Sequence, residues 1–407
     1  MARSLFQKIL LIESDSDEEL EIIAKLAMEE ERSTLHSPSK RRRTFIMRDT
    51  LQAGKDLFHD YFAERPLYPH KYFRMRFQMS RLLFCRIQNA VEAHDIYFVQ
   101  QRDGSKRLGF SSLQKINAAL RMLAYGVTAD FMDEYLKIGE PTALESLKKF
   151  VKAVISIFSE EYLRSPNNQD IARLLAEGEK RGFPGMLGSI DYMHWKWKNC
   201  PTSWQGMYSG HIHEPTIILE AVASYDLWIW HPFFGLPGSH DGINVLDRSL
   251  LFSYLAQGRA PPVNYTINNH NYTMGYYLVD GIYPQWATFV KTISSSQGNR
   301  RKHFAAAQES ARKDVERAFR VLQARFAIVR GPARFFYPEM LKDIMIACVI
   351  LHNMIVEDER DDNGAEDFEY EQFNQPLEPV TSGPTNDFRE FIQSHHCIRD
   401  TETHSQL

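Results

Sequence analysis

The residues Met186-Leu-Gly-Ser-Ile-Asp191 form a short, mostly apolar run that ends in a carboxylate. All six tryptophans lie between Trp195 and Trp286, so the densest core material follows directly after this run. Three further β-rich runs follow, at 215–224, 227–235 and 276–280. Two helical runs come after them, at 300–327 and 339–356. Strands that are followed by helices predict an α/β domain, which we place at residues 182–356.

Two of the β-rich runs end in an acidic residue. Asp191 ends the first run, and Asp280 ends Tyr276-Tyr-Leu-Val-Asp280. A carboxylate at the carboxyl end of a strand points into the crevice where α/β sheets bind ligands. Glu316 lies next to the apolar stripe of a strong helix, 312–325, so it can lean over the edge of the sheet. Three carboxylates in one cleft repel each other unless a cation neutralises them, and hard oxygen ligands favour Mg²⁺ or Mn²⁺.

Each of these acids also has an ordinary structural explanation. Asp191 could cap a loop, and Asp280 could begin an Asp-Gly turn. Glu316 could form an ion pair with Arg312 or Arg320, one helical turn away. Spacing alone therefore leaves a metal site and a set of structural carboxylates both open. The sequence contains neither a phosphate-binding loop nor a nucleophile elbow, which argues against an NTPase or a serine hydrolase.

An amino-terminal region, residues 54–175, is predicted to be helical. Ser112–Tyr125 has apolar residues at helical spacing, and a second helix is expected over Thr128–Leu136. A third is expected to begin at Thr142, which can form a capping box with Glu145. This third helix carries lysines on the side opposite its apolar residues: Lys148, Lys149 and Lys152. The pattern suits a DNA-binding helix-turn-helix, but spacing alone favours a plain helical bundle with a solvated lysine face.

The charge of the chain is unevenly distributed. The net charge is -4, yet residues 300–334 hold ten Lys and Arg against three acids. Two acidic segments, 13–31 and 357–371, hold nine acids each. A basic interior stretch suggests an anionic partner, although solvated helix faces show the same composition.

Both ends of the chain are predicted to lie outside the folded region. We expect residues 1–53 to form a disordered arm and 357–407 an acidic tail. The arm contains a basic cluster that a nuclear import receptor can bind: Lys40, Arg41, Arg42 and Arg43. No apolar stretch is long enough to cross a bilayer, which excludes a membrane-spanning protein. The four cysteines are far apart in the sequence, which fits a reducing compartment.

Several longer motifs, all in the same region, point to one family. They are Gly188-Ser-Ile-Asp-Tyr-Met-His-Trp-Lys-Trp-Lys-Asn-Cys-Pro-Thr202, Leu219-Glu-Ala-Val-Ala-Ser-Tyr-Asp-Leu-Trp-Ile-Trp230, Phe234-Gly-Leu-Pro-Gly238, Asp280-Gly-Ile-Tyr-Pro284, Arg312-Lys-Asp-Val-Glu-Arg-Ala-Phe319 and Ile350-Leu-His-Asn-Met-Ile-Val-Glu357. Together they resemble the plant PIF/Harbinger transposase family over about residues 70–359. The resemblance implies an RNase H-like fold with a DDE catalytic triad, here preceded by the helical, helix-turn-helix-like domain.

The implied triad is Asp191, Asp280 and Glu316. In an RNase H-like fold the first and fourth strands are parallel neighbours, which would place the two aspartates side by side. Thirty-five residues separate Asp280 from Glu316, a spacing typical of many DDE transposases.

One motif departs from the family pattern. The family usually has an aspartate three positions after Pro-Gly-Ser, whereas here Asp241 comes one position earlier and Gly242 stands in its place. Asp241 is therefore a candidate for a further metal ligand. A displaced ligand can impair a site that needs placement within about half an ångström.

The resemblance also implies a reaction and its partners. The reaction would be phosphodiester hydrolysis and strand transfer on double-stranded DNA, at the element's ends and at a target, with two Mg²⁺ or Mn²⁺ ions held by the triad. Basic residues of the helix around Glu316 would hold phosphates: Arg312, Lys313, Arg317 and Arg320. A separate Myb-like DNA-binding protein would act with the chain in the nucleus, and self-association is left open. The rival interpretation is a catalytically impaired nuclear factor, derived from a transposase, that binds DNA or protein without cutting.

Overall fold

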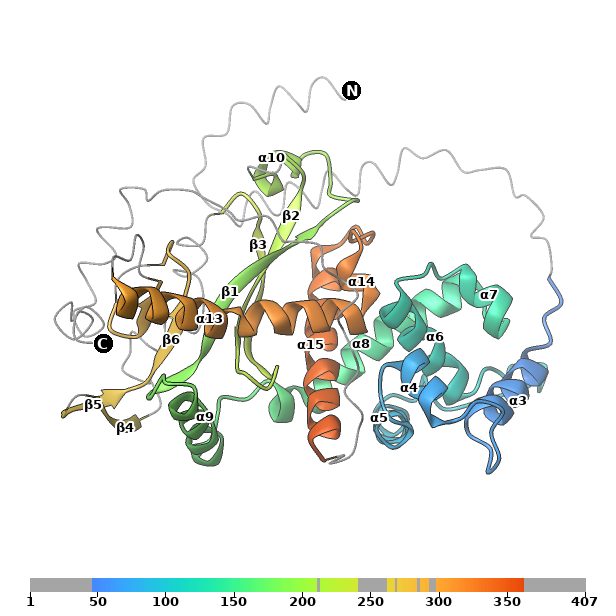
Figure 1. Cartoon of the computed structure of the whole chain (residues 1–407). Helices are drawn as coiled ribbons and strands as arrows, with labels where there is room; N and C mark the ends of the chain where they lie inside the picture. Colours follow the sequence, from blue (N-terminus) through green and yellow to red (C-terminus); the bar gives the residue numbers. More distant parts are fainter. Residues whose placement is uncertain are drawn as a thin grey trace, which may run out of the picture. The chain divides into compact units, whose positions relative to one another are not determined.

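Figure 1 shows the computed structural model of the chain, which describes residues 46–210, 213–240, 262–267, 269–283, 286–292 and 298–361. The import cluster at 40–43, the displaced Asp241 and nearly all of the predicted acidic tail lie outside these residues. From Asp49 onward the described residues belong to one unit. Among the helices of that part of the chain, none is long and apolar enough to cross a membrane.

A mixed five-stranded sheet forms the centre of the structure, with the strand order β3-β2-β1-β6-β7. β1 pairs with β2, and β2 with β3, in antiparallel fashion, whereas β1, β6 and β7 run parallel to one another. A separate hairpin consists of β4 and β5. The strands are β1 (Met186–Lys196), β2 (Thr216–Ala223), β3 (Ile229–Pro237), β4 (Pro262–Ile267), β5 (His270–Met274), β6 (Tyr276–Val279) and β7 (Phe289–Lys291). The predicted α/β class is confirmed.

β1 is longer than its sequence run suggested. The prediction that Asp191 ends a strand is wrong, because β1 continues to Lys196 while paired with β2. In its second half Met193 and Trp195 are buried, so one face still packs on the core. On its other edge β1 loses its neighbour near Asp191, because the parallel partner β6 ends at Val279. The carboxylate therefore lies where one edge of the strand opens.

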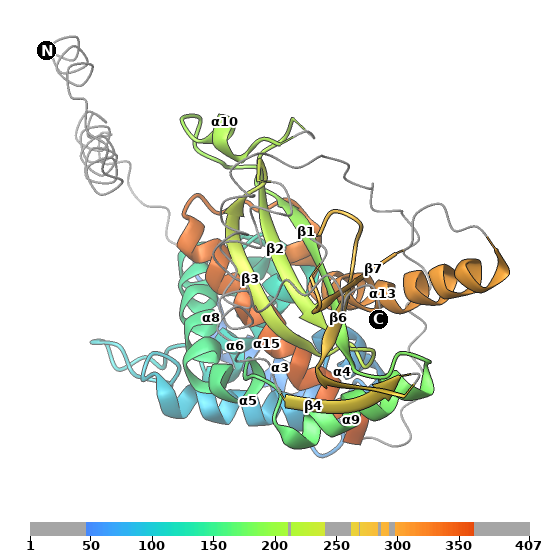
Figure 2. The same cartoon turned by 90° about the vertical axis from the view of Figure 1, so that its left-hand side faces the viewer.

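Helices cover the sheet (Figures 1 and 2). α13 packs on β1, β2 and β6, α9 packs on β1, and α15 packs on β3. α13 buries the predicted stripe of Val315, Phe319 and Leu322 against the sheet. These helices and the short ones near them are α9 (Asn168–Lys180), α10 (Gln205–Tyr208), α13 (Asn299–Arg325), α14 (Ala327–Arg330) and α15 (Pro338–Asp361).

The region before the sheet is helical, as predicted. Its helices are α3 (Thr50–Tyr61), α4 (His70–Phe77), α5 (Arg81–His94), α6 (Ser112–Tyr125), α7 (Phe131–Leu136) and α8 (Glu140–Tyr162). α6 has the predicted bounds and ends at Gly126, whose φ of 63° is a left-handed conformation that glycine adopts readily. The predicted capping box at Thr142 is wrong, because α8 already begins at Glu140 after an extended Gly139. Pro141 is tolerated in that first turn since its missing N–H would have no partner there.

The long helices α8 and α15 join the helical region to the sheet. They pack on each other, and α15 also contacts β3. Asn353 of α15 is fully buried and forms hydrogen bonds with both β3 and α8. Its amide donates to the carbonyl oxygens of Ile229 and Tyr162, each at 2.8 Å, and its side-chain oxygen accepts from Ile229 N at 2.9 Å. One hydrophobic core therefore runs from the helical region into the sheet, while the predicted division into domains stays a prediction.

Candidate functional site

The three predicted acids come from neighbouring elements. Ser189 of β1 pairs with Leu278 of β6, and Asp191 and Asp280 each follow two positions later along these parallel strands. Glu316 lies on α13, the helix that crosses β1 and β6. The charges of Glu316 and Asp280 both act on Asp191. The structure therefore brings the three carboxylates together where β6 ends beside β1.

A guanidinium group lies among these carboxylates. Arg312 Nη1 is 3.3 Å from Asp191 Oδ2, and Arg312 Nη2 is 3.0 Å from Glu316 Oε1. Arg312 Nη2 also lies 3.1 Å from Glu309 Oε1, one turn before it on α13. The Arg312 side chain is nearly buried, so water screens its attraction to these acids only weakly. It serves as the counter-cation of the cluster in this structure.

The pKa of Asp191 reflects its buried position among other acids. It is raised to about 7, chiefly by burial, with smaller contributions in the same direction from the charges of Glu316 and Asp280. A hydrogen bond from Tyr192 N, at 2.8 Å, and the charge of Arg312 act in the opposite direction. A carboxyl group poised in this way takes up a proton or a cation readily.

The ordinary structural contacts of these acids are present as well. Asp280 accepts a hydrogen bond from Gly281 N, as an Asp-Gly turn requires. Glu316 lies 3.7 Å from Arg320 in addition to its contact with Arg312. Lys291 of β7 adds a positive charge that acts on Asp280. Asp280 and Glu316 therefore make ordinary local contacts and also belong to the cluster of carboxylates.

The donor chemistry of the cluster fits a hard divalent cation. Asp191, Asp280 and Glu316 offer only carboxylate oxygens, which Mg²⁺ and Mn²⁺ prefer. Their mutual repulsion calls for a positive charge, and Arg312 supplies one. Within the described residues, no group of three or more His, Cys, Asp or Glu side chains is arranged to hold a metal ion as it stands. Arg312 thus occupies carboxylate oxygens of Asp191 and Glu316 that a cation would use.

The sequence analysis missed two residues beneath the cluster. Glu220 is fully buried in β2, opposite Tyr192 of β1. Tyr283 follows Asp280 in the turn after β6 and is also buried. Burial raises the pKa of Tyr283, and so do the charges of Glu220, Asp191 and Asp280, which places the phenol among these acids. A single charged residue in an otherwise apolar strand was the available signal for Glu220.

The basic residues of α13 divide into two kinds. Arg312 is nearly buried and occupied by carboxylates, so it is not free to hold DNA as the sequence analysis expected. Lys313, Arg317 and Arg320 are exposed and form ion pairs with acids of their own helix. Arg317 also donates a hydrogen bond to the carbonyl oxygen of Tyr225. Asp314 of α13 also pairs with Arg181, which anchors the helix beside α9.

The lysines of α8 are also not equivalent. Lys148 and Lys152 are exposed, on a narrow stripe of a helix that otherwise packs against α5, α6 and α15. Lys149 lies 3.3 Å from Asp95 and forms an ion pair with it. Two of the three predicted DNA-binding lysines therefore face solvent.

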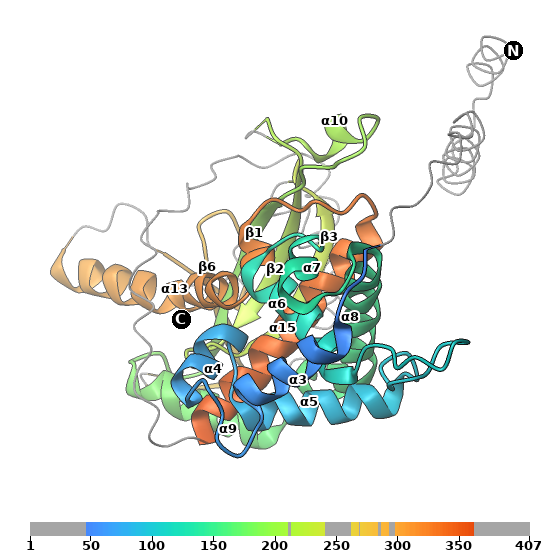
Figure 3. The ribbon, with the colours of Figure 1, turned by 90° about the vertical axis from the view of Figure 1, so that its right-hand side faces the viewer.

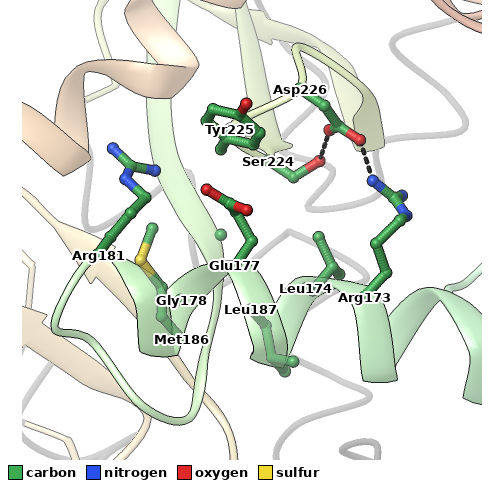
Figure 4. Close-up of a pocket in the computed structure, with 11 residues that line it drawn as sticks. Arg173, Leu174, Glu177, Gly178, Arg181, Met186, Leu187, Ser224, Tyr225 and Asp226 are labelled. Atoms are coloured by element: carbon green, nitrogen blue, oxygen red, sulfur yellow. Dashed lines mark hydrogen bonds and ion pairs between the residues drawn. The ribbon is translucent and has the colours of Figure 1, made fainter. Parts of the chain in front are cut away.

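A pocket of about 220 Å³ lies at the other end of β1, away from Asp191 (Figure 4). α9 contributes Arg173, Glu177 and Arg181 to its lining. Asp226 accepts hydrogen bonds from Arg173 and Ser224, as the dashed lines in Figure 4 mark. Arg173 pairs with Asp226, Arg181 with Asp314 and Glu177 with Lys180, so the charged groups of the pocket have partners, and the acidic cluster lies elsewhere.

Comparison with sequence models of known families shows to which family the chain belongs. The sequence model of a family described as plant transposon protein matches residues 160–363, a segment that contains β1, β6, α13 and the whole acidic cluster. The chain belongs to the plant transposon protein family. In this plant transposon protein a domain of unknown function also matches residues 55–92, within α3–α5. Neither the curated proteins nor the solved structures include a match to it.

Proposed function

We propose that this chain is a DDE-type DNA transposase, a nuclease that cleaves and transfers phosphodiester strands with divalent metal ions. The observation that carries the proposal is the register of β1 and β6, which sets Asp191 beside Asp280 with Glu316 across from them on α13. The strand order, with two antiparallel pairs followed by parallel strands, supports an RNase H-like fold. Family membership adds to this support.

Each residue of the cluster has a role in this proposal. Asp191, Asp280 and Glu316 would hold two Mg²⁺ or Mn²⁺ ions, with Asp241 as a further candidate ligand. When bound, the ions would activate a water or a DNA 3′-hydroxyl and stabilise the leaving oxygen. Arg312 neutralises the acids in their absence. The exposed Lys313, Arg317 and Arg320 would bind DNA phosphates, which contributes affinity but no sequence choice.

Nicking of supercoiled DNA tests the proposal. Asp191→Asn, Asp280→Asn and Glu316→Gln should each abolish Mn²⁺-dependent nicking while DNA binding persists. Glu309→Gln is the matched control, because Glu309 contacts Arg312 but is not a proposed ligand. A triad variant that nicks at the wild-type rate would remove that residue from the proposed site.

A second candidate function is a nuclear factor that binds DNA or protein without cutting. The ion pairs of Arg312 with Asp191 and Glu316 favour it, because a guanidinium group occupies the place of the metal. The altered motif at Asp241 and Gly242 favours it as well. Sequence-specific DNA binding by wild-type protein that shows no nicking in Mn²⁺ would select this alternative.

Location and partners are further proposals. We infer nuclear import through the cluster at 40–43, and cooperation with a separate Myb-like DNA-binding protein. Replacing Lys40, Arg41, Arg42 and Arg43 with alanine in a fluorescent fusion should shift the protein from the nucleus to the cytoplasm. An unchanged distribution would show that another segment directs import.

A further inference from the structure

Two arginines of the helical region converge on one phenol. Arg121 of α6 donates to the hydroxyl oxygens of Tyr61 and Tyr135, each at 3.3 Å. Arg76 of α4 donates to the same Tyr61 hydroxyl. These residues come from α3, α4, α6 and α7, which contact one another in the helical region (Figure 3). We call Tyr61, Arg76, Arg121 and Tyr135 the arginine–tyrosine cluster.

The positive charge of this cluster has no acidic counterpart. Within the part of the chain that the structure describes, neither Arg76 nor Arg121 forms an ion pair with a carboxylate. Tyr135 supplies no negative charge, because burial raises the pKa of its phenol. Arg121 is only 9% exposed, so its charge is poorly solvated. Buried charges normally have a partner of opposite sign, since desolvation otherwise costs several kcal/mol.

The other buried arginines of the described residues follow that rule. Arg312 pairs with Asp191, whereas Arg74 and Arg325 both pair with Glu359. In the cluster, aromatic rings take the place of carboxylates. The guanidinium carbon of Arg121 lies 4.8 Å from the ring centre of Phe77, and that of Arg76 lies 3.9 Å from the ring centre of Tyr68. Such contacts stabilise a cation by about 0.5–2 kcal/mol and leave its charge available to an anion.

Exposed rings border the two guanidinium groups. Tyr72 lies 5.9 Å from the charge of Arg76 and is 48% exposed, and Tyr125 lies 5.4 Å from that of Arg121 and is 44% exposed. The ring of Tyr135, at 5.1 Å from Arg121, is 40% exposed. Aromatic faces beside unpaired positive charges suit a chain of alternating phosphates and bases, because the bases stack while the phosphates pair with arginine.

We propose that the arginine–tyrosine cluster binds a single-stranded segment of nucleic acid, with a phosphate on Arg76, the unpaired charge of the buried Arg121 adding attraction, and unpaired bases on the exposed tyrosines Tyr72, Tyr125 and Tyr135. Bases in a duplex are already stacked on each other, so the rings favour an unpaired strand. The choice of DNA as that strand rests on the proposed function. The C-terminal end of α6 lies against α14, which follows α13, so the cluster belongs to the unit that carries the acidic site.

Fluorescence anisotropy of the full-length protein with a labelled oligothymidylate of about 12 nucleotides tests the proposal. Arg76→Gln and Tyr72→Leu should each weaken binding about fivefold or more, and Arg76→Gln should shallow the log-log salt slope by about 0.7. Arg107→Gln and Tyr337→Leu, which change exposed residues elsewhere, should bind as wild type. The side chains of Arg76 and of the bordering Tyr72 both reach solvent, and a thermal unfolding curve for each variant verifies that it folds.

Two competitors decide what the cluster recognises. An oligonucleotide without bases should bind more weakly than oligothymidylate to wild-type protein, and the Tyr72→Leu variant should bind both equally. If Arg76→Gln weakens the binding of duplex DNA as strongly as it weakens the binding of the single strand, the preference for unpaired bases is overturned. Two results together would also overturn the proposal: polyglutamate displaces oligothymidylate, and Tyr72→Leu binds oligothymidylate as tightly as wild type does. They would assign the cluster to an acidic polypeptide such as residues 13–31.

The outcome can be separated from that of the proposed function. Asp191→Asn should lose nicking and keep the wild-type affinity for oligothymidylate. A wild-type protein that never nicks DNA, but binds the strand through Tyr72 and Arg76, would refute the nuclease and support the cluster. Unchanged strand binding in both cluster variants would refute the cluster and leave the nuclease test unaffected.

Discussion

Arg312 of α13 donates a hydrogen bond to Asp191 of β1 across 3.3 Å, although 121 positions separate them in the sequence. The contact ties the helix to the sheet and sets a positive charge beside the acids of the proposed metal site. If the proposal holds, arginine and metal ion compete for the same carboxylates, and the balance between them can be measured.

Arg312→Gln is expected to shift that balance. Without metal the variant should lose about 3 kcal/mol of unfolding free energy, because Asp191, Glu309 and Glu316 lose the positive charge that neutralises them. Added Mn²⁺ should then raise its Tm by more than it raises the wild-type Tm. Arg320→Gln is the control, since Arg320 is exposed and lies farther from Glu316. An equal Mn²⁺ effect in both proteins would mean that Arg312 and the metal do not compete.

Restoring the family motif should raise activity. The combined change His240→Asn, Asp241→Asn and Gly242→Asp returns the aspartate to its usual place, and nicking should increase about tenfold to a hundredfold if displacement limits the reaction. His240→Asn alone serves as the control. No gain, or a loss, would indicate that Asp241 already occupies a working position or that the segment is structural.

The lysines of α8 should differ in their effect on DNA binding. Lys148→Ala and Lys152→Ala should each shallow the log-log salt slope of duplex binding by about 0.9 if each lysine neutralises one phosphate. Lys149→Ala should change the slope less, because Lys149 is paired with Asp95. Alanine keeps the helix intact in all three. Unchanged affinity in the first two variants would restrict α8 to packing and move DNA contact to α13 or a partner.

His352 gives the fold a dependence on pH. Its Nε2 donates to the carbonyl oxygen of Leu227 at 2.8 Å, and its Nδ1 accepts from Arg325 at 3.2 Å, so the ring is neutral. Burial lowers its pKa to about 3, and the charge of Arg325 lowers it as well. The folded pKa lies below the unfolded value of about 6.5. The contribution of His352 to stability is therefore complete above about pH 6.5 and is lost as pH falls toward 3.

His352→Gln should remove this dependence, because glutamine can donate to Leu227 and accept from Arg325 without titrating. Relative to wild type, the variant should gain about 2 kcal/mol of unfolding free energy between pH 6.5 and 5. Urea denaturation across this range measures the difference. His70→Gln, which changes an exposed residue of α4, should leave the wild-type curve unaltered. Parallel curves for His352→Gln and wild type would show that the ring does not titrate in this range.

Several elements could be predicted from sequence because their signals are local. The apolar spacing and Gly126 give both ends of α6, and the stripe of α13 identifies its buried face. The continuation of β1 also had a local signal, the alternation through Met193 and Trp195, which the sequence analysis did not use. The start of α8 was misplaced because Thr142 offers a good capping pattern, while Pro141 and the packing of α8 on its neighbours extend the helix backwards.

The site was predicted only in part because its chemistry depends on distant pairs. The neighbourhood of Asp191 and Asp280 followed from the family resemblance, which implies parallel strands. The i, i+4 spacing indicated that Arg312 could pair with Glu316, but nothing local shows that it also reaches Asp191. The burial of Glu220 and Tyr283 among the acids likewise arises only when β1, β2 and β6 assemble.

The position of α15 at the end of the described residues has a consequence for synthesis on the ribosome. Asn353 and His352 bind the edge of β3 and the end of α8, so neither the helical region nor the sheet is complete until α15 has emerged. A copy interrupted by a stop codon before α15 would expose the apolar faces of both parts and would be a substrate for proteolysis. An open reading frame through α15 is therefore required even of a copy that only binds DNA.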